Sequence, residues 1–153
     1  MEERGGTVAT KGLLGNFSHK LDGKGRMVLP AHFREPMGAK VIATISTNRR
    51  CIAVRSEEEW EKFDARLQAE FEANNRIAPV RTMILGFAKD IDIDSAGRIL
   101  VPVELRNRLK IGSEVSVIGS RDHIQIWDTK SWNDWCDEIE PRFDELLEGI
   151  PGL

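Results

Sequence analysis

The chain has 153 residues, of which 41% are hydrophobic and 31% charged, and its formal net charge at pH 7 is −3. This composition is ordinary for a soluble globular protein, and the length allows one domain or two small ones that share a core. No apolar run approaches the roughly 18 residues of a membrane-spanning helix, and the acidic N-terminus lacks the apolar stretch of a secretory signal. Cys51 and Cys136 have no metal-ligand spacing, so we expect free thiols in the cytoplasm.

The first half of the chain is predicted to contain short strands and helices after an N-terminal extension, residues 1–12, which we expect to be disordered. These elements are strands at 13–21 and 26–29, a short helix at 30–38, strands at 41–45 and 51–54, a helix at 56–76, and a short helix at 80–85 after a break at Pro79. Asp22 and Gly25 bound a turn, because aspartate and glycine are turn-forming residues. Ser56 and Glu59 have the spacing of a capping box, which opens a helix with an apolar face.

The second half repeats the first at an offset of 72 residues. Five residues of the segment 22–34 recur in 94–106: Asp22/Asp94, Gly25/Gly97, Arg26/Arg98, Pro30/Pro102 and Arg34/Arg106. The offset continues further along the chain, for example at Ile45/Val117, Arg49/Arg121 and Ile52/Ile124. The second half is therefore predicted to contain a strand at 91–93, a turn at 94–97, a strand at 99–101, a helix at 102–109, strands at 115–118 and 124–127, and a helix at 128–148 that Pro141 kinks or ends.

This repeat predicts an α+β fold built from two pseudo-symmetric units, residues 13–58 and 86–130, each followed by one of the long helices. A unit of this size buries too little surface to be stable alone, so we expect each unit to cover the apolar face of the other. The short strands would interleave into one small β-barrel, with the helices flanking it. The apolar stripes of the helices are interpreted as core or subunit contacts.

No catalytic or metal site is predicted. His19, His32 and His123 fit no metal-ligand spacing. Gly23-Lys24-Gly25 lacks the spacing of a phosphate-binding loop. Asp90, Asp92 and Asp94 alternate along one strand face, but no matching glycine-rich loop accompanies them. We therefore expect no enzymatic activity, no cofactor and no small-molecule substrate.

The turn at 22–25 has the residues to contact nucleic acid. Lys24 and Arg26 alternate along an extended chain, and arginine has a planar fork suited to phosphate or guanine. The second turn has Ala96 in place of Lys24, and Asp92 in place of Lys20. Residues 1–55 hold ten basic and four acidic residues, a formal charge of +6, whereas the remainder carries −9. We therefore predict that the first turn binds nucleic acid and that the second is mainly structural, and an ion pair with Asp22 is the alternative role for Arg26.

Asp22, Gly25, Asp94, Gly97 and Arg98 are expected to have structural roles in the two turns. Each aspartate would accept backbone N–H bonds across its turn. This role of Asp22 does not compete with nucleic-acid binding by its neighbours.

Three segments together resemble the MraZ family: residues 14–34, their copy at 94–106, and Ile124-Gln-Ile-Trp127. Members of that family carry two SpoVT-AbrB-type swapped-hairpin units in one chain, and the resemblance covers about residues 13–145. It implies a cytoplasmic, nucleoid-associated bacterial transcriptional regulator. Such a protein binds double-stranded DNA at short direct repeats upstream of the cell-division and cell-wall gene cluster, and it assembles as a ring-shaped homo-oligomer.

The family's DNA-contacting arginine falls on Arg26 and its lysine on Lys24. His19, Lys20 and Arg34 complete the set that we predict to contact DNA. The alternative is an antitoxin-like inhibitor with the same hairpin fold, whose acidic C-terminal helix, residues 128–148, would mask the basic surface of a toxin. Such inhibitors usually carry one hairpin unit and a disordered tail, which favours the regulator.

Overall fold

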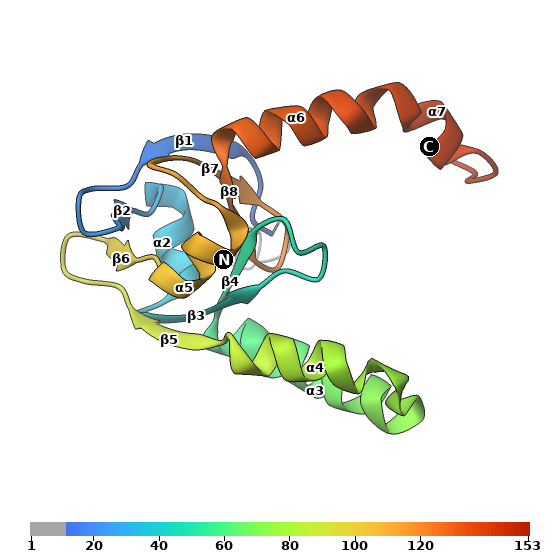
Figure 1. The fold of residues 1–153 in the computed structure, drawn as a ribbon, viewed down its shortest axis with the longest axis horizontal. Helices are drawn as coiled ribbons and strands as arrows, with labels where there is room; N and C mark the ends of the chain where they lie inside the picture. The colour runs from blue at the N-terminus through green and yellow to red at the C-terminus, as the bar shows by residue number, and fades with distance from the viewer. Residues whose placement is uncertain (1–11) are drawn as a thin grey trace, which may run out of the picture.

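The computed structural model describes residues 12–153, so the predicted disorder of the N-terminal extension lies outside the described chain, apart from Gly12. The first half comprises β1 (Asn16–Lys20), β2 (Arg26–Val28), α2 (Ala31–Met37), β3 (Lys40–Ile45), β4 (Ile52–Ser56), α3 (Glu57–Ala73), the 3-10 helix η2 (Asn75–Ile77) and α4 (Ala78–Gly86). The second half comprises β5 (Lys89–Asp92), β6 (Arg98–Leu100), α5 (Val103–Leu109), β7 (Glu114–Gly119), β8 (Ile124–Asp128), α6 (Thr129–Ile139), the 3-10 helix η3 (Glu140–Arg142) and α7 (Phe143–Leu147). The fold is α+β, and the predicted order of strands and helices recurs in both halves (Figure 1).

The two halves exchange their first strands in one antiparallel sheet of order β1-β7-β8-β4-β3-β5. β1 of the first half pairs with β7 of the second, and β5 of the second pairs with β3 of the first. At the centre β4 pairs with β8, where Ile52 lies opposite Ile126. Each half therefore completes the sheet of the other.

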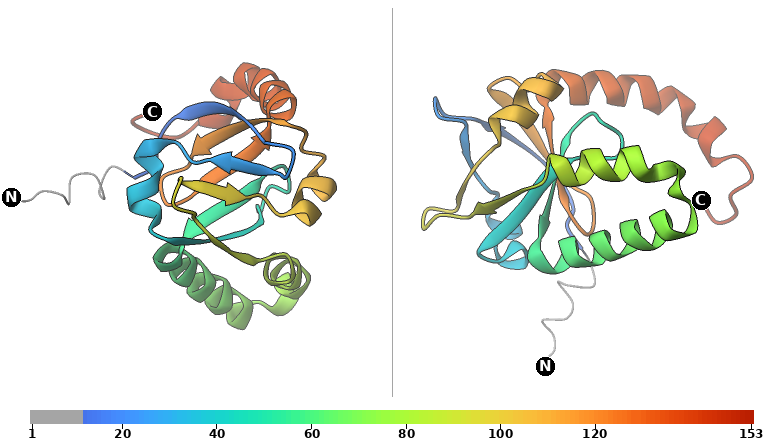
Figure 2. Two further views of the ribbon diagram at one scale, coloured as in Figure 1. Left: turned by 90° about the vertical axis from the view of Figure 1, so that its left-hand side faces the viewer. Right: turned by 60° about the horizontal axis from the view of Figure 1, so that its bottom comes forward.

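The strands that follow the two turns form a separate two-stranded ribbon. β2 pairs antiparallel with β6, and Met27 lies opposite Ile99. The ribbon crosses one face of the molecule, with the two turns at its opposite ends (Figure 2, left). Beyond the ribbon, Leu29 donates its N–H to the carbonyl of Gly97, and Val101 donates to that of Gly25, both at 2.9 Å. Each strand is thus tied to the turn of the other half.

The expectation of one small closed barrel is wrong for the described chain. β1 and β5 are the two edges of the six-stranded sheet, which stays open. The physical reason lies in the turns. After each turn the chain leaves the sheet, and β2 and β6 pair with each other instead of closing back on β1 and β5.

The offset of 72 residues breaks in one interval of the repeat. The connection before β7 spans residues 110–113, whereas the one before β3 spans only 38–39. The following turn, 120–123, is correspondingly shorter than its equivalent, 46–51, so the offset is restored in β8. Because side chains alternate along a strand with a period of two, the two-residue shift leaves every side chain of β7 on its predicted face.

The hydrophobic core draws on both halves and lies between the sheet and the ribbon with its two short helices. Its largest fully buried side chains include Phe33, Met27 and Leu29 from the first half and Ile99, Leu105 and Ile126 from the second. Burial of apolar surface from both units is the main stabilising contribution that a single unit of this size could not supply.

The long helices project from the side of the molecule opposite the ribbon (Figure 1; Figure 2, right). α3 begins where predicted, with the Ser56 hydroxyl accepting a bond from the Glu59 N–H at 3.2 Å. It is accompanied by α4, where the Arg81 guanidinium lies 4.6 Å from the centre of the Phe71 ring. The predicted break between the two helices is present but lies a few residues before Pro79, at residues 74–77. Pro79 itself sits in the first turn of α4, where its missing N–H removes no helical hydrogen bond.

We call residues 129–147 (α6, η3 and α7) the C-terminal arm. Its base packs on the body through a cluster of three indole rings, in which Trp127 contacts both Trp132 and Trp135 at centroid distances of 5.2 and 5.4 Å. Pro141 ends α6, and α7 continues after η3. None of the helices in the described chain combines the length and the apolar character that crossing a membrane requires.

Candidate nucleic-acid interface

The first turn, residues 22–25, is organised by one carboxylate. Asp22 Oδ1 accepts the backbone N–H groups of Lys24 and Arg26 at 2.8 and 2.9 Å, and Asp22 Oδ2 accepts from Arg26 Nε at 2.9 Å. These bonds favour the ionised form, and the Arg26 backbone N–H contributes most to lowering the Asp22 pKa to about 2. Gly25 has a φ of 84°, a conformation that glycine adopts without steric cost.

The second turn, residues 94–97, reproduces this arrangement. Asp94 accepts the backbone N–H groups of Ala96 and Arg98 at 2.9 and 2.8 Å, and it pairs with Arg98 Nε at 2.8 Å. The Arg98 backbone N–H is the main cause of a lowered Asp94 pKa. The ion pair considered as the alternative for Arg26 is therefore present in both turns. Arg26 keeps 33% of its side-chain surface exposed and Arg98 keeps 38%, so pairing fixes these arginines without burying them.

A second pair of arginines links each turn to the helix of the other half. The Arg106 guanidinium of α5 packs on Gly25, so a Cβ there would lie 2.8 Å from Nη2. The Arg34 guanidinium of α2 packs equivalently on Gly97. The two glycines leave the room that these guanidinium groups occupy. This explains why both sequence copies contain the same four residues. The aspartate and the nearby arginine form the ion pair of the turn, and the glycine makes room for the later arginine of the other half.

The two turns differ in charge. Lys24 lies exposed at the tip of the first turn, where the second has Ala96. Lys20 is exposed at the end of β1, opposite Glu114 of β7, whereas Asp92 holds the equivalent place in β5. His19 is half-buried, and its burial lowers the imidazole pKa, so the ring is neutral at pH 7.

Four of the five predicted DNA-contacting residues lie in one continuous segment, from β1 through the first turn to β2. His19, Lys20, Lys24 and Arg26 follow one another along β1, the first turn and β2. Arg34 lies at the second turn instead, and its Nε donates to the Leu29 carbonyl at 3.2 Å. Sequence reasoning missed Arg106, which is the arginine of the other half that contacts the first turn. The sequence did indicate that Arg34 and Arg106 are equivalent positions of the repeat. Only the exchange of strands shows which turn each of these arginines reaches.

No group of three or more histidine, cysteine, aspartate or glutamate side chains in the described chain is arranged to hold a metal ion. The two thiols are unpaired among the described residues, and burial raises the pKa of Cys51 to about 11. A thiol held in its protonated form at neutral pH is a poor nucleophile.

These features define a class of protein: a single chain in which two α+β repeats exchange strands and hold two equivalent Asp-capped turns at one face. Comparison with known proteins shows to which family of this class the chain belongs. A family model described as "MraZ protein, putative antitoxin-like" matches residues 13–81 and 83–148. The chain belongs to the MraZ family.

Curated relatives cover nearly the whole chain. A protein of Thermoanaerobacter sp. (strain X514) is 33% identical over 92% of this chain and 98% of its own length. One of Carboxydothermus hydrogenoformans is 33% identical over 88% and 94%, and one of Arthrobacter sp. (strain FB24) is 34% identical over 92% and 98%. Each of the three is named transcriptional regulator MraZ.

Proposed function

We propose that the protein is a DNA-binding transcriptional regulator that acts through its first turn. Its targets would be short direct repeats upstream of the cell-division and cell-wall gene cluster, as the family resemblance implies. The observation that carries the proposal is the first turn itself, which presents Lys24 and a fixed, partly exposed Arg26 beside Lys20. The names of the relatives support the same class of function.

The ion pair with Asp22 favours recognition by Arg26. It engages Nε and one carboxylate oxygen, and among the described residues no hydrogen-bond partner is found for the two terminal amino groups. A guanidinium held in one orientation loses less conformational entropy when it binds a base edge or a phosphate. Lys24 would add a mobile charge that contacts phosphate without reading sequence.

A ring-shaped homo-oligomer would supply the affinity that one turn lacks. A single turn makes few phosphate contacts, so isolated binding should be weak and sensitive to salt. Several identical turns on one assembly could engage successive direct repeats and gain avidity. Interfaces that join different surfaces of neighbouring copies close into rings when the rotation closes. The C-terminal arm, with Phe143, Leu146 and Leu147 exposed, is the candidate for such an interface.

The test compares equivalent substitutions in the two turns. Arg26→Ala and Arg98→Ala each remove the same ion pair, so Arg98→Ala measures the structural part of the effect. Fluorescence anisotropy with a duplex from the upstream region should show that Arg26→Ala abolishes binding at moderate salt while Arg98→Ala weakens it far less. Lys24→Ala should reduce the slope of log affinity against log salt by about one.

A duplex with scrambled repeats and a mass measurement in solution complete this test. Equal losses from Arg26→Ala and Arg98→Ala would show that the arginines act only through turn structure. Equal affinity for the scrambled duplex would show that binding is not specific for the repeats. A change of mass in Arg26→Ala would show that the arginine supports assembly.

An antitoxin-like role is the second candidate, which the description of the family model favours. The C-terminal arm is acidic and exposes apolar side chains, including Phe143 and Leu146, a combination suited to covering a basic protein surface. Expression in the native host, followed by purification at low salt, should then yield a stoichiometric complex with one small basic protein. A regulator without this role would purify as the chain alone.

A further inference from the structure

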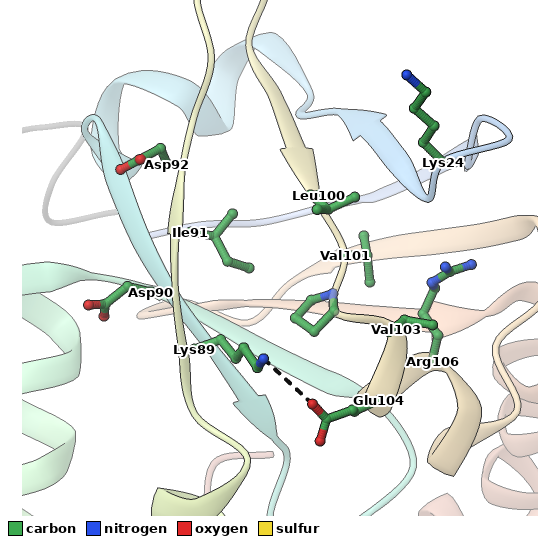
Figure 3. A pocket seen from close by; sticks show the side chains of 11 residues that line it. Lys24, Lys89, Asp90, Ile91, Asp92, Leu100, Val101, Val103, Glu104 and Arg106 are labelled. Carbon is green, nitrogen blue, oxygen red and sulfur yellow. Dashed lines mark ion pairs between the residues drawn. The ribbon is translucent and has the colours of Figure 1, made fainter.

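A pocket of about 600 Å³ opens beside the first turn, but its walls come mainly from the second half. It lies between β5, the end of β6 and the start of α5 (Figure 3). Lys24 of the first turn also lines it, but the Lys24 amine points away from the apolar floor in this view. Its volume falls within the range of known small-molecule sites.

The pocket exists because the pseudo-symmetry is broken at two positions. In the first half, Phe17 and His32 pack edge to face at a centroid distance of 4.9 Å. At the equivalent positions, 72 residues later, the second half has Lys89 and Glu104, whose charged groups lie 3.5 Å apart. An aromatic pair that fills space is thus replaced by two flexible, exposed side chains.

The floor of the pocket is apolar and unusually exposed. Leu100 and Val103 leave 53% and 55% of their surfaces accessible, and Val101 and Pro102 continue this floor. Val103 is the first residue of α5, and its equivalent in the first half is the much smaller Ala31. This apolar surface would favour an occupant with a hydrocarbon body.

The charged groups available to an occupant are cations. The carboxylates of Asp90 and Asp92 point to the side of β5 away from this floor, and Glu104 is paired with Lys89 (Figure 3). Arg106 and Lys24 remain on the rim.

Arg106 also has an unused donor. Its Nε is buried and has no hydrogen-bond partner among the described residues. The equivalent Nε of Arg34 donates to the Leu29 carbonyl. Because this Nε is not accessible from the pocket, an occupant would meet the terminal amino groups of Arg106 instead, and a carboxylate is the acceptor that an arginine fork fits best.

We propose that this pocket binds a small amphipathic carboxylate. Its apolar body would lie on Leu100 and Val103, and its carboxylate would accept from Arg106, while the exposed Lys24 side chain would turn towards it. Because Arg106 packs on Gly25, an occupant would contact the groups that shape and charge the first turn. If the turn binds DNA as proposed above, on which only this consequence rests, the occupant competes for Lys24 and weakens DNA binding.

Octanoate is the probe. Acetate, which has the carboxylate without the long chain, and 1-octanol, which has the chain without the carboxylate, are the controls. Isothermal titration of the full chain should detect octanoate binding and give much weaker binding, or none, for either control. Val103→Asp places a carboxylate on the floor and should weaken octanoate binding at least about tenfold, because like charges oppose each other. Ala31→Asp makes the same change at the equivalent first helical position of α2 and should leave the affinity unchanged.

A second variant fills the pocket instead of charging it. Lys89→Phe combined with Glu104→His copies the Phe17–His32 pair into the second half and should abolish octanoate binding while the thermal unfolding transition is retained. Absence of heat with the wild-type chain, equal affinity for 1-octanol, or an equal effect of Ala31→Asp would overturn the proposal.

The link to DNA is measured separately. With saturating octanoate, the affinity for the repeat duplex should fall about fivefold or more, a coupling of ordinary size for two interacting sites. The Val103→Asp chain should bind DNA with the same affinity whether or not octanoate is present. Octanoate binding with unchanged DNA affinity would refute the coupling alone. Failure of the chain to bind DNA would refute the proposed function, and the titration would still decide the pocket.

Discussion

At the scale of single residues, the two aspartates determine how the turns respond to acid. Asp22 accepts two backbone N–H bonds and one guanidinium bond, which lower its pKa from 3.8 to about 2 in the folded chain. A carboxyl with a lowered folded-state pKa contributes stability that is fully present above the unfolded value and is lost as the pH falls through the folded value. The contribution of Asp22 to stability is therefore lost as the pH falls from about 4 to about 2.

Asp22→Asn should reveal this dependence. The variant should be less stable than the wild type at neutral pH, and the difference in unfolding free energy should shrink as the pH falls from about 4 towards 2, where the wild-type carboxyl becomes neutral. Urea unfolding at a series of pH values measures it. The difference in unfolding free energy between Asp94→Asn and the wild type should also shrink as the pH falls, since the Asp94 pKa is also lowered. A difference that stays constant across the range would mean that Asp22 contributes through shape and not through charge.

The glycines of the turns can be separated from ordinary positive-φ glycines. Gly97 and Gly38 have φ values of 78° and 76°, but only Gly97 has a guanidinium, that of Arg34, where a Cβ would lie. Gly38→Ala should cost about 1–3 kcal/mol from backbone strain, because a φ of 76° with a ψ of −153° lies in a region that is essentially restricted to glycine. Gly97→Ala should cost about 1–3 kcal/mol more, because Arg34 must move. Chemical denaturation gives both values, and equal costs would show that Arg34 moves aside freely.

At the scale of elements, the sequence repeat predicted the kind and order of nearly every strand and helix. It succeeded because each turn carries its own local signals, such as Asp22 and Gly25, and because apolar residues follow the periods of strand and helix. The two-residue shift before β7 did not disturb this prediction, since it preserves the inward face.

Strand pairing was the part that local signals could not determine. The sequence of the turn reads as a β1–β2 hairpin, yet β2 pairs with β6. Partner choice depends on which arrangement buries Met27 and Ile99 together, and this is a property of the whole chain. For the same reason, the sequence could not show which turn Arg34 reaches, and the exchanged fold carries it to the second.

Substitutions in the ribbon test how far it holds the two halves together. Met27 and Ile99 are opposite one another and are 2% and 1% exposed. Each change to alanine should cost about 2–5 kcal/mol, and the double variant should cost less than the sum, because the pair shares one contact. Val28→Ala, on the exposed face, should cost less than about 1 kcal/mol. Strictly additive losses in equilibrium denaturation would show that the two halves are stabilised independently.

At the scale of the whole molecule, the surface proposed to bind DNA and the surface proposed for assembly lie at opposite ends. The turns lie at the ends of the ribbon, and the long helices project from the other side (Figure 1). Residues 1–55, which include the first turn, carry a formal charge of +6, and the remainder, which includes both long helices, carries −9. Such a charge distribution would orient a copy towards an anionic duplex and keep the acidic arm away from it.

The C-terminal arm allows this division to be tested. Every residue from 140 to 153 is exposed in the single chain, so these residues add little to its stability. Removal of residues 140–153 should leave the unfolding free energy within about 0.5 kcal/mol of the full chain, as for other exposed surface. If the arm joins neighbouring copies, light scattering should show a lower mass for the shortened chain.

Shortening should also separate assembly from recognition. Without avidity, affinity for a duplex with several repeats should fall to that for a single repeat, whereas affinity for the single repeat should stay the same. Truncation also removes acidic residues, so charge-reversing substitutions of Asp144 and Glu145 in the full-length chain serve as the control. These variants should keep the mass of the wild-type assembly if the interface depends on Phe143, Leu146 and Leu147. An unchanged mass after truncation would place the interface elsewhere, with the α3–α4 pair, where Val80 and Met83 are exposed, as the next surface to test.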